Sequence, residues 1–461
     1  MSLQFADRLN NVETSAIREL FKLLGKPGII SFAGGFPDSA MFDVEGIREA
    51  SSQALSQEPG AALQYGATEG YGPLREQLAH FMGQKGVSDL AAEQLIVTTG
   101  SQQALDLLGK TMISPGDKVI VEGPTFLATI QCFRLYGAEL ISAPVDGEGV
   151  DTVALEKLIA ENRPKFVYVI PTFGNPTGAL LSLARRKKLL ELAVKYQTLM
   201  VEDDPYGDLY FNEAPPPSLL ALSAQVPGSR DWLVHCGSLS KVLSPGLRVG
   251  WMIAPSELLS RAVMCKQFSD AHTSTFAQAT AAHYLKAGRM PATLDKVRKV
   301  YADRAQTMCD ALRKDLGNAI SFVQPQGGLF VWAHLTGANG NVKDGNTFAK
   351  MAIDQGVAHT DSLRMKGVNA AVLMAGSADI GRETQDLKVV VVPEINAGTA
   401  SLLATVVNPA MALGTFIAQW LLRRPLSEAN TQEFSVRGTW ADPVIERVAR
   451  KTVPVPVGSN P

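Results

Sequence analysis

The segment "HCGSLSKVLSPGLRVGW" (235–251) places one lysine, Lys241, among small hydroxyl residues and follows it with Arg248. A lysine held in a site that lowers its pKa is a nucleophile for Schiff-base chemistry. Arg248 and the hydroxyl of Ser238 could bind a phosphate group beside it. Most lysines are solvated surface charges, so this segment alone leaves that alternative open.

A second segment, "TTGSQQALDLL" (98–108), predicts a strand, a Gly-Ser turn and the start of a helix. Free N–H groups at Gly100, Ser101 and Gln102 would form an anion site, because the first N–H groups of a helix have no partner within it. An ordinary capped helix is the alternative interpretation.

Two further segments end predicted strands with polar side chains. "NPTG" (175–178) places the amide of Asn175 at a strand end, and "VEDDPY" (201–206) ends the next strand with two carboxylates and a tyrosine. A carboxylate buried there is costly without a partner, and a cationic ring nitrogen would be such a partner.

These residues follow short apolar runs that are predicted to be strands, and segments of helix length separate the runs. This alternation predicts an α/β domain with a mainly parallel sheet covered on both faces, which binds ligands at the carboxyl ends of its strands. "GGLFVWAHL" (327–335) predicts a strand of a second, smaller domain. The predicted strands are 95–99, 118–122, 165–170, 198–203, 232–236 and 248–254, and the helices 101–112, 125–136 and 182–195.

Length and composition narrow the class of protein. A chain of 461 residues predicts two or three domains, and a net charge of -2 gives no sign of a nucleic-acid surface. The four cysteines form no CxxC pair and have no histidine at metal-ligand spacing, so we expect reduced thiols and no metal site. The first twenty residues contain no apolar run typical of a signal peptide, so we expect a cytoplasmic protein.

Taken together, the motifs resemble the fold type I, pyridoxal-phosphate-dependent aminotransferases of class I/II. The resemblance covers residues 1 to about 358 and is strongest to the branch that handles 2-aminoadipate, aromatic and branched-chain amino acids. It rests on "SFAGGFPD" (31–38), "LQYGATEGYGPLRE" (63–76), "TTGSQQALDL", "NPTG", "EDDPY", "SLSKVLSPGLRVGW" and "QGGLFVWAHL".

The resemblance implies a role for each matching residue. Lys241 would bind the cofactor aldehyde and move the substrate proton, and Asp203 would keep the pyridinium nitrogen protonated. Asn175 and Tyr206 would donate to the phenolic oxygen of the ring, and Phe126 would stack on the ring. The phosphate would be held by Gly100, Ser101, Gln102, Ser238 and Arg248, and by Tyr65 of the neighbouring subunit of a homodimer. Gly34 and Gly35, with Asn175, would approach the substrate carboxylate.

Three other residues near these motifs have structural interpretations. Asp204 follows the cofactor carboxylate directly and is assigned a structural role. His235 and His272 belong to no motif and are interpreted as packing or surface residues.

The resemblance changes after about residue 358. Aminotransferases continue with a strand that carries an arginine for the substrate carboxylate, and here the nearest candidate is Arg364, in "SLRMKG". This part instead resembles the C-terminal end of YhdP-type, AsmA-like envelope proteins, with "GVAHTDSLRMKG", "RETQDLKVVVVPEINAGTASL", "VNPAMALGTFIAQ" and "GTWADP". "GVA" (356–358) suits both families, so we place the junction there.

The two resemblances imply a domain plan. It consists of an N-terminal segment joining the small domain (1–45), a large cofactor domain (46–260), a truncated small domain (261–358) and an atypical C-terminal segment (359–461). Within the last, 395–422 carries no charge and is long enough to span a bilayer. Amphipathic or buried helices are the preferred interpretation, because Asn408, Pro409 and Gln419 interrupt the run. The tail "VPVPVGSNP" is expected to be disordered.

The predicted function is transfer of an amino group from an L-amino acid to a 2-oxo acid with pyridoxal 5'-phosphate, impaired if the altered C-terminus lacks the carboxylate clamp. Decarboxylase, β-lyase and racemase activities share most of these residues and stay open. An envelope lipid-transport component without transaminase activity, or a chimera of two genes, is the alternative from another class.

Overall fold

The computed structural model describes residues 5–9, 34–335, 357–366, 370–379, 384–393, 432–439 and 442–447. It divides into two compact units, Met1–His334 and Leu335–Pro461. The predicted boundaries at 45, 260 and 358 stay predictions. The uncharged run 395–422 and the tail 453–461 lie outside the described residues.

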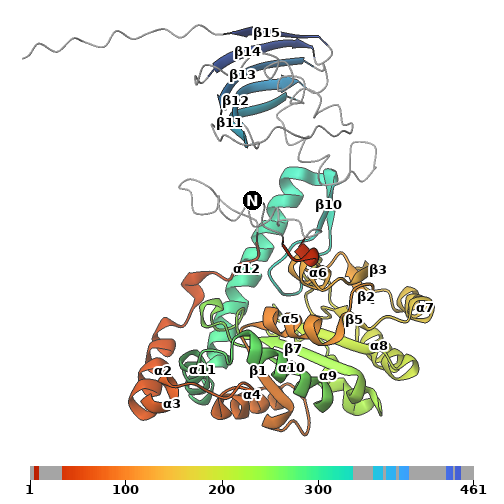
Figure 1. The fold of residues 1–461 in the computed structure, drawn as a ribbon, viewed down its shortest axis with the longest axis vertical. Coiled ribbons are helices and arrows are strands. Elements are labelled where there is room, and N and C mark those ends of the chain that lie inside the picture. Colours follow the sequence, from red (N-terminus) through yellow and green to blue (C-terminus); the bar gives the residue numbers. More distant parts are fainter. Residues whose placement is uncertain are drawn as a thin grey trace, which may run out of the picture. The chain divides into compact units, whose positions relative to one another are not determined.

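An eight-stranded mixed sheet forms the centre of the first unit (Figure 1). Its strand order is β1-β8-β7-β6-β5-β2-β3-β4. The pairs among β2, β3, β5, β6 and β7 are parallel, whereas β8 runs antiparallel to β1 and β7. The strands are β1 Leu95–Thr98, β2 Lys118–Gly123, β3 Glu139–Asp146, β4 Gly149–Val150, β5 Phe166–Val169, β6 Leu199–Asp204, β7 Leu233–Ser238 and β8 Gly250–Ile253.

Every residue of β1, β5, β7 and β8 is buried. Successive side chains of a strand point to opposite faces of the sheet. Because every residue of these strands is buried, both faces of the sheet are covered. The helices of this unit are α2 Val44–Gln57, α3 Pro59–Leu63, α4 Gly72–Gln84, α5 Ser101–Met112, α6 Leu127–Leu135, α7 Thr152–Asn162, α8 Leu183–Tyr196, α9 Leu219–Leu222, α10 Ser256–Ser269, α11 Thr275–Lys286 and α12 Met290–Leu316.

The six predicted strands and three predicted helices of this sheet are all present, with ends shifted by a few residues. Short 3-10 helices complete the unit: η1 Asp7–Leu9, η2 Ser39–Met41, η3 Ala92–Gln94, η4 Ser223–Gln225, η5 Ser229–Trp232, η6 Pro245–Leu247 and η7 Gly317–Ala319. Among the described residues, no helix is long and apolar enough to cross a membrane.

The predicted strand 327–335 is wrong over most of its length. Only Ala333–Leu335 is a strand (β10), and it pairs with β9 Ile320–Phe322 in a two-stranded sheet. Gly328 has a φ of +75°, which is outside the β region, and a Cβ on Gly327 would lie 2.4 Å from the ring of Phe173. The two glycines therefore form a close-packed turn, and the apolar residues after them pack without pairing.

The second unit contains a five-stranded antiparallel sheet in sequence order, β11-β12-β13-β14-β15. Its strands are β11 Val357–Lys366, β12 Ala370–Asp379, β13 Thr384–Pro393, β14 Gln432–Thr439 and β15 Pro443–Arg447. Val389 pairs with Phe434 and both are buried, whereas Asp386 and Arg437, which pair further along the same two strands, are exposed. These two strands therefore have one buried and one exposed face.

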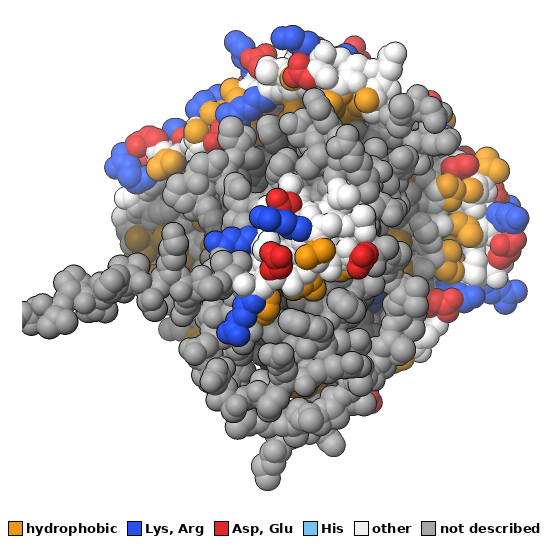
Figure 2. Space-filling model, turned by 90° about the horizontal axis from the view of Figure 1, so that it is seen from above, with side chains coloured by type: hydrophobic (Ala, Val, Ile, Leu, Met, Phe, Trp, Pro, Cys, Tyr) orange, Lys and Arg blue, Asp and Glu red, His pale blue; other side chains and the backbone are white. Residues whose placement is uncertain are grey.

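The described surface carries charged side chains of both signs. On the face drawn in Figure 2, the described Lys and Arg side chains are interspersed with Asp and Glu side chains. This mixture matches the near balance of 43 basic and 45 acidic residues in the whole chain.

Candidate active site

The parallel strands β5, β6 and β7 bring three predicted site residues to one edge of the sheet. Asp203 on β6 is in register with Cys236 on β7, so Ser238 at the end of β7 lies at the same edge. Asn175 follows β5, which pairs in parallel with β6. The carboxyl ends of these strands therefore converge, as the sequence predicts.

Asp203 is 2% exposed, and its two carboxylate oxygens have different surroundings. Oδ2 accepts a hydrogen bond of 2.7 Å from the hydroxyl of Tyr168. Oδ1 is buried and has no hydrogen-bond partner in the described structure. Burial raises the pKa of Asp203 to about 6, with Asp204 and Glu202 adding to the increase and Tyr168 opposing it. Such a carboxylate is suited to a cationic ligand, because a positive charge at Oδ1 would supply the missing partner.

Tyr168 and Thr129 are site residues that the sequence did not predict. The hydroxyl of Thr129 donates to the hydroxyl of Tyr168 at 3.2 Å, so the donor to Asp203 is itself held in place. Glu122 lies in the same buried region, and burial raises its pKa to about 8, with Asp203 adding to the increase. Tyr168 is a fully buried residue of β5, where an aromatic side chain is indistinguishable from core in the sequence.

Asn175 and Tyr206 are in direct contact, because the amide of Asn175 donates to the hydroxyl of Tyr206 at 3.3 Å. Burial raises the pKa of Tyr206. The ring of Phe330 lies edge-on to Tyr206 at a centroid distance of 5.7 Å. On Gly35, with a φ of +52°, a Cβ would lie 2.5 Å from Phe330, so the backbone there approaches the aromatic pair closely. Gly34 also has positive φ, +97°.

The loop after β7 brings Lys241 and Arg248 together. It is closed at its base by a hydrogen bond of 3.0 Å from the N–H of Leu239 to the carbonyl of Val249. Burial and the charge of Arg248 lower the pKa of Lys241. The hydroxyl of Ser238 accepts from the N–H of Ser240 at 3.1 Å and so helps to fix this loop. Lys241 is thus a partly desolvated amine beside a second cation, which is the environment that favours a neutral, nucleophilic lysine.

The predicted phosphate turn lies between β1 and α5. Ser101 and Gln102 are the first two residues of α5, so their N–H groups have no partner within the helix. The N–H of Gly100, expected to be free, instead donates to the carbonyl of Thr98 at 2.8 Å, and that detail of the prediction is wrong. Gly100 has a φ of +78°, and its carbonyl accepts from Gln103.

Arg248 and Gly250 pack directly on this turn. The guanidinium of Arg248 donates to the carbonyl of Thr99 at 3.2 Å, and a Cβ on Gly100 would lie 2.5 Å from it. A Cβ on Gly250 would lie 2.7 Å from the N atom of Ser101, so this first residue of β8 has room only for glycine. A guanidinium and the start of a helix thus converge on one point, an arrangement that binds a phosphate group.

The remaining predicted residues lie around this centre. Phe126 is the N-terminal cap residue of α6, partly buried against the core, and Tyr65 is 84% exposed. The ring of Tyr65 lies edge-on to His272 at 5.7 Å. His235 is buried, with its Nδ1 2.8 Å from Glu202, and Asp204 accepts from the N–H of Gly207 at 3.0 Å.

Arg364 does not belong to the unit that carries the other site residues. It is a residue of β11 in the second unit, in register with Leu373. Among the described residues, no group of His, Cys, Asp and Glu is arranged to hold a metal ion.

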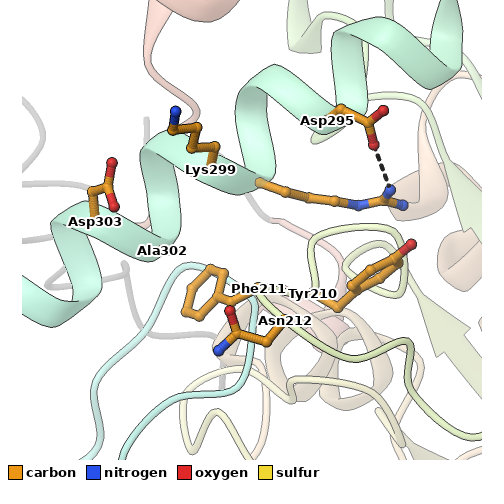
Figure 3. A pocket seen from close by; sticks show the side chains of 8 residues that line it. Tyr210, Phe211, Asn212, Asp295, Lys299, Ala302 and Asp303 are labelled. Atoms are coloured by element: carbon orange, nitrogen blue, oxygen red, sulfur yellow. Dashed lines mark hydrogen bonds and ion pairs between the residues drawn. The ribbon is translucent and has the colours of Figure 1, made fainter.

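The described residues of the first unit line at least two cavities. One of about 490 Å³ is lined by residues next to the site, including Thr177, Gly123 and Phe330. The other, of about 390 Å³, lies between α12 and the segment 210–212 and contains none of the predicted site residues (Figure 3). There Arg298 forms a 3.3 Å ion pair with Asp295 and lies 3.7 Å over the ring of Tyr210.

Comparison with protein families matches residues 28–371 to "Aminotransferase class I and II" and residues 346–445 to "YhdP protein". The first match extends past the predicted junction at 358, and the two overlap over 346–371. The chain is 43% identical over 333 residues to 2-aminoadipate transaminase of Thermus thermophilus, covering 72% of this chain and 81% of that protein. It is 38% identical over 336 residues to aromatic-amino-acid aminotransferase 1 of Thermococcus litoralis, covering 72% and 79%.

A solved structure supports the same relationship. The crystal structure of LysN, an α-aminoadipate aminotransferase from Thermus thermophilus complexed with N-(5'-phosphopyridoxyl)-L-leucine, superposes with a TM-score of 0.67 at 40% identity. The superposition covers 72% of this chain and 82% of that one.

Proposed function

Since the chain belongs to the class I and II aminotransferases, we propose that it transfers an amino group from an L-amino acid to a 2-oxo acid with pyridoxal 5'-phosphate held by the site above. The observation that carries this proposal is Asp203, a buried carboxylate with one unpartnered oxygen at the carboxyl edge of the sheet. When bound, the cofactor withdraws electrons from the substrate α-carbon, provided that its ring nitrogen stays protonated.

In this proposal Asp203 holds the ring nitrogen in its protonated form. Tyr168 donates to Oδ2, so Oδ1 is the oxygen that would accept a hydrogen bond from the ring nitrogen. Asn175 and Tyr206 would donate to the phenolic oxygen of the ring, and Phe126 would pack on its face. Their mutual hydrogen bond keeps Asn175 and Tyr206 oriented before a ligand binds.

Lys241 is the residue that moves the proton. Its neutral amine would hold the cofactor at the aldehyde group and, when released from it, would accept the proton of the substrate α-carbon at Nζ. Burial and Arg248 favour this neutral form by lowering the pKa of Lys241. The same Arg248, with Ser238 and the N–H groups of Ser101 and Gln102, would hold the phosphate.

The substrate class is a finer part of the proposal. The similarity to a 2-aminoadipate and an aromatic-amino-acid enzyme supports donors of these types. Gly34, Gly35 and Asn175 are proposed to contact the substrate carboxylate. We further propose that residues after about 358 are a YhdP-like segment in place of the aminotransferase C-terminus, supported by the match over 346–445 and by a separate antiparallel sheet.

This replacement is proposed to weaken substrate binding, because the YhdP-like segment would stand where aminotransferases carry the arginine fork for the α-carboxylate. The proposed assembly is a homodimer in which the exposed Tyr65 reaches the phosphate of the neighbouring subunit. The cytoplasm remains the predicted location.

The test uses the full-length protein purified with pyridoxal 5'-phosphate. We expect a yellow protein that converts 2-oxo acids when supplied with 2-aminoadipate, aromatic or branched-chain donors. Lys241→Ala is expected to lose the yellow colour and at least about 10²- to 10⁴-fold in rate, the range typical of acid–base catalysis. Lys157→Ala is the matched control, because Lys157 is an exposed lysine of α7 that pairs with Glu161, and this variant should keep both. A colourless protein that takes up no added cofactor would refute the proposal.

A further inference from the structure

A buried lysine lies behind the proposed phosphate turn. Lys266, on α10, is 0% exposed, and no motif of the sequence included it. Its Nζ donates to both carboxylate oxygens of Asp270 at 2.8 and 3.0 Å, to Oε1 of Gln103 at 3.1 Å and to the hydroxyl of Thr273 at 3.1 Å. A lysine is almost never fully buried unless it is paired, so the role of Lys266 depends on these polar partners and not on packing alone.

The partners of Lys266 meet at one residue, Thr99. The N–H of Thr99 donates to Oε1 of Gln103 at 2.8 Å, and its hydroxyl donates to Oδ2 of Asp270 at 3.1 Å. The same hydroxyl is 3.1 Å from that of Thr273. Gln103 also donates to Asp270 at 2.7 Å, which closes the network on itself.

Thr99 directly precedes Gly100 and Ser101. Its carbonyl is held from the other side by Arg248, so all three polar groups of Thr99 are hydrogen-bonded. Gly100 has a backbone φ of +78°. Glycine has many accessible conformations, so without other contacts this residue would not keep that conformation. The network therefore holds Thr99 in place, and the position of Thr99 determines the direction of the first N–H groups of α5.

We propose that Lys266, acting through Gln103, Asp270 and Thr99, is a positioning residue for phosphate binding by the turn at Gly100–Gln102. This inference rests on the proposed function, because the phosphate is that of the proposed cofactor. Lys266 and Asp270 together carry no net charge, so their contribution is geometric: they hold donors in place without adding attraction for the anion. A loss of the network should thus affect the phosphate selectively and leave ring binding intact.

The experiment compares two ligands that differ only in the phosphate, pyridoxal 5'-phosphate and pyridoxal, by absorbance titration of the apoprotein. The variants are Lys266→Met, which keeps the length of the side chain, and Gln103→Leu, which cuts the link to Thr99. We expect each to weaken binding of pyridoxal 5'-phosphate about ten- to a hundredfold and that of pyridoxal by less than about twofold, because the lost hydrogen bonds involve charged groups and act on the phosphate alone.

Tyr284→Phe is the matched control. Tyr284 is 0% exposed and its hydroxyl contacts Asp43 and Thr293, so the variant loses buried hydrogen bonds to residues outside the network. It should leave the ratio of the two affinities unchanged. If Lys266→Met or, should that variant not fold, Gln103→Leu weakens both ligands equally, the network is structural and the inference is wrong. If the wild-type protein binds neither ligand, the proposed function itself fails.

Discussion

The two sheets of this chain bury their strands in different ways. In the eight-stranded sheet of the first unit, strands such as β5 and β7 are buried at every residue. In the five-stranded sheet of the second unit, buried Val389 and Phe434 alternate along their strands with exposed Asp386 and Arg437.

The difference explains where chemistry can occur in each unit. A strand covered on both faces exposes only its ends, so polar side chains of the first unit converge at one edge and are desolvated there. In the second sheet Asp386 and Arg437 lie on an exposed face, where water screens their charges. The shifted pKa values of Lys241, Asp203 and Glu122 all belong to the first unit.

The largest expected effect comes from the same substitution made once in each unit. Asp203→Asn should lower the transamination rate about 10²- to 10⁴-fold, because breaking a buried charge pair costs about 3–5 kcal/mol. Asp386→Asn changes an exposed carboxylate of the second sheet and should leave the rate unchanged. Steady-state kinetics of both variants check this. A rate of Asp203→Asn within twofold of the wild type would contradict the proposed role of Asp203.

A second matched pair tests whether the units unfold separately. Phe166→Ala on β5 and Phe434→Ala on β14 each remove a buried aromatic ring and should each lower the unfolding free energy of their own unit by about 3–5 kcal/mol. Phe166 also loses its edge-on contact with Phe133 at 5.1 Å.

Thermal unfolding is followed by circular dichroism and by cofactor absorbance. Only Phe166→Ala should release the cofactor at a lower temperature. An equal shift in cofactor release for Phe434→Ala would show that the two units unfold as one.

The smallest expected effects concern two ion pairs. Asp43 caps α2 and accepts from Arg289 at 2.8 Å in a half-buried site, whereas Asp386 and Arg437 pair at 3.1 Å in the open. Asp43→Ala should cost about 0.5–2 kcal/mol through loss of the cap, and Asp386→Ala about 0–1 kcal/mol.

Acid should distinguish these two pairs further. The hydrogen bond from Arg289 lowers the pKa of Asp43 from 3.8 to about 2. A lowered folded-state pKa stabilises the protein above the unfolded value, so this contribution is present at neutral pH and is lost as the pH falls from about 4 to about 2. Urea unfolding at pH 7 and pH 3 measures it. An unchanged difference between Asp43→Ala and wild type at the two pH values would contradict the assignment.

Part of this arrangement can be read from the sequence. The strands β1, β2, β5, β6, β7 and β8 are apolar runs of the right length, and the motifs that follow them lie at the edge predicted. β3 and β4 are absent from the prediction because Ala143 is the one buried residue of β3 and β4 has only two residues, so neither forms a continuous apolar run.

The residues that support the site are harder to predict. Tyr168 and Lys266 act through partners that are distant in the chain, Asp203 and Gln103, and no local pattern encodes such a pair. The glycine turn at 327–328 resembles a strand in sequence because the apolar residues that follow it look alike in both states.

The position of Gly250 has a consequence for how the protein is made. β1 lies at the edge of its sheet and pairs with β8. Thr98 of β1 is opposite Gly250 of β8, and Gly250 packs on Gly100 and Ser101. During synthesis the ribosome releases the turn long before it releases β8, because the two are far apart in sequence. A nascent chain that ends before Gly250 already contains Lys241 and has no assembled phosphate site. The complete phosphate site can therefore form only after translation has passed β8.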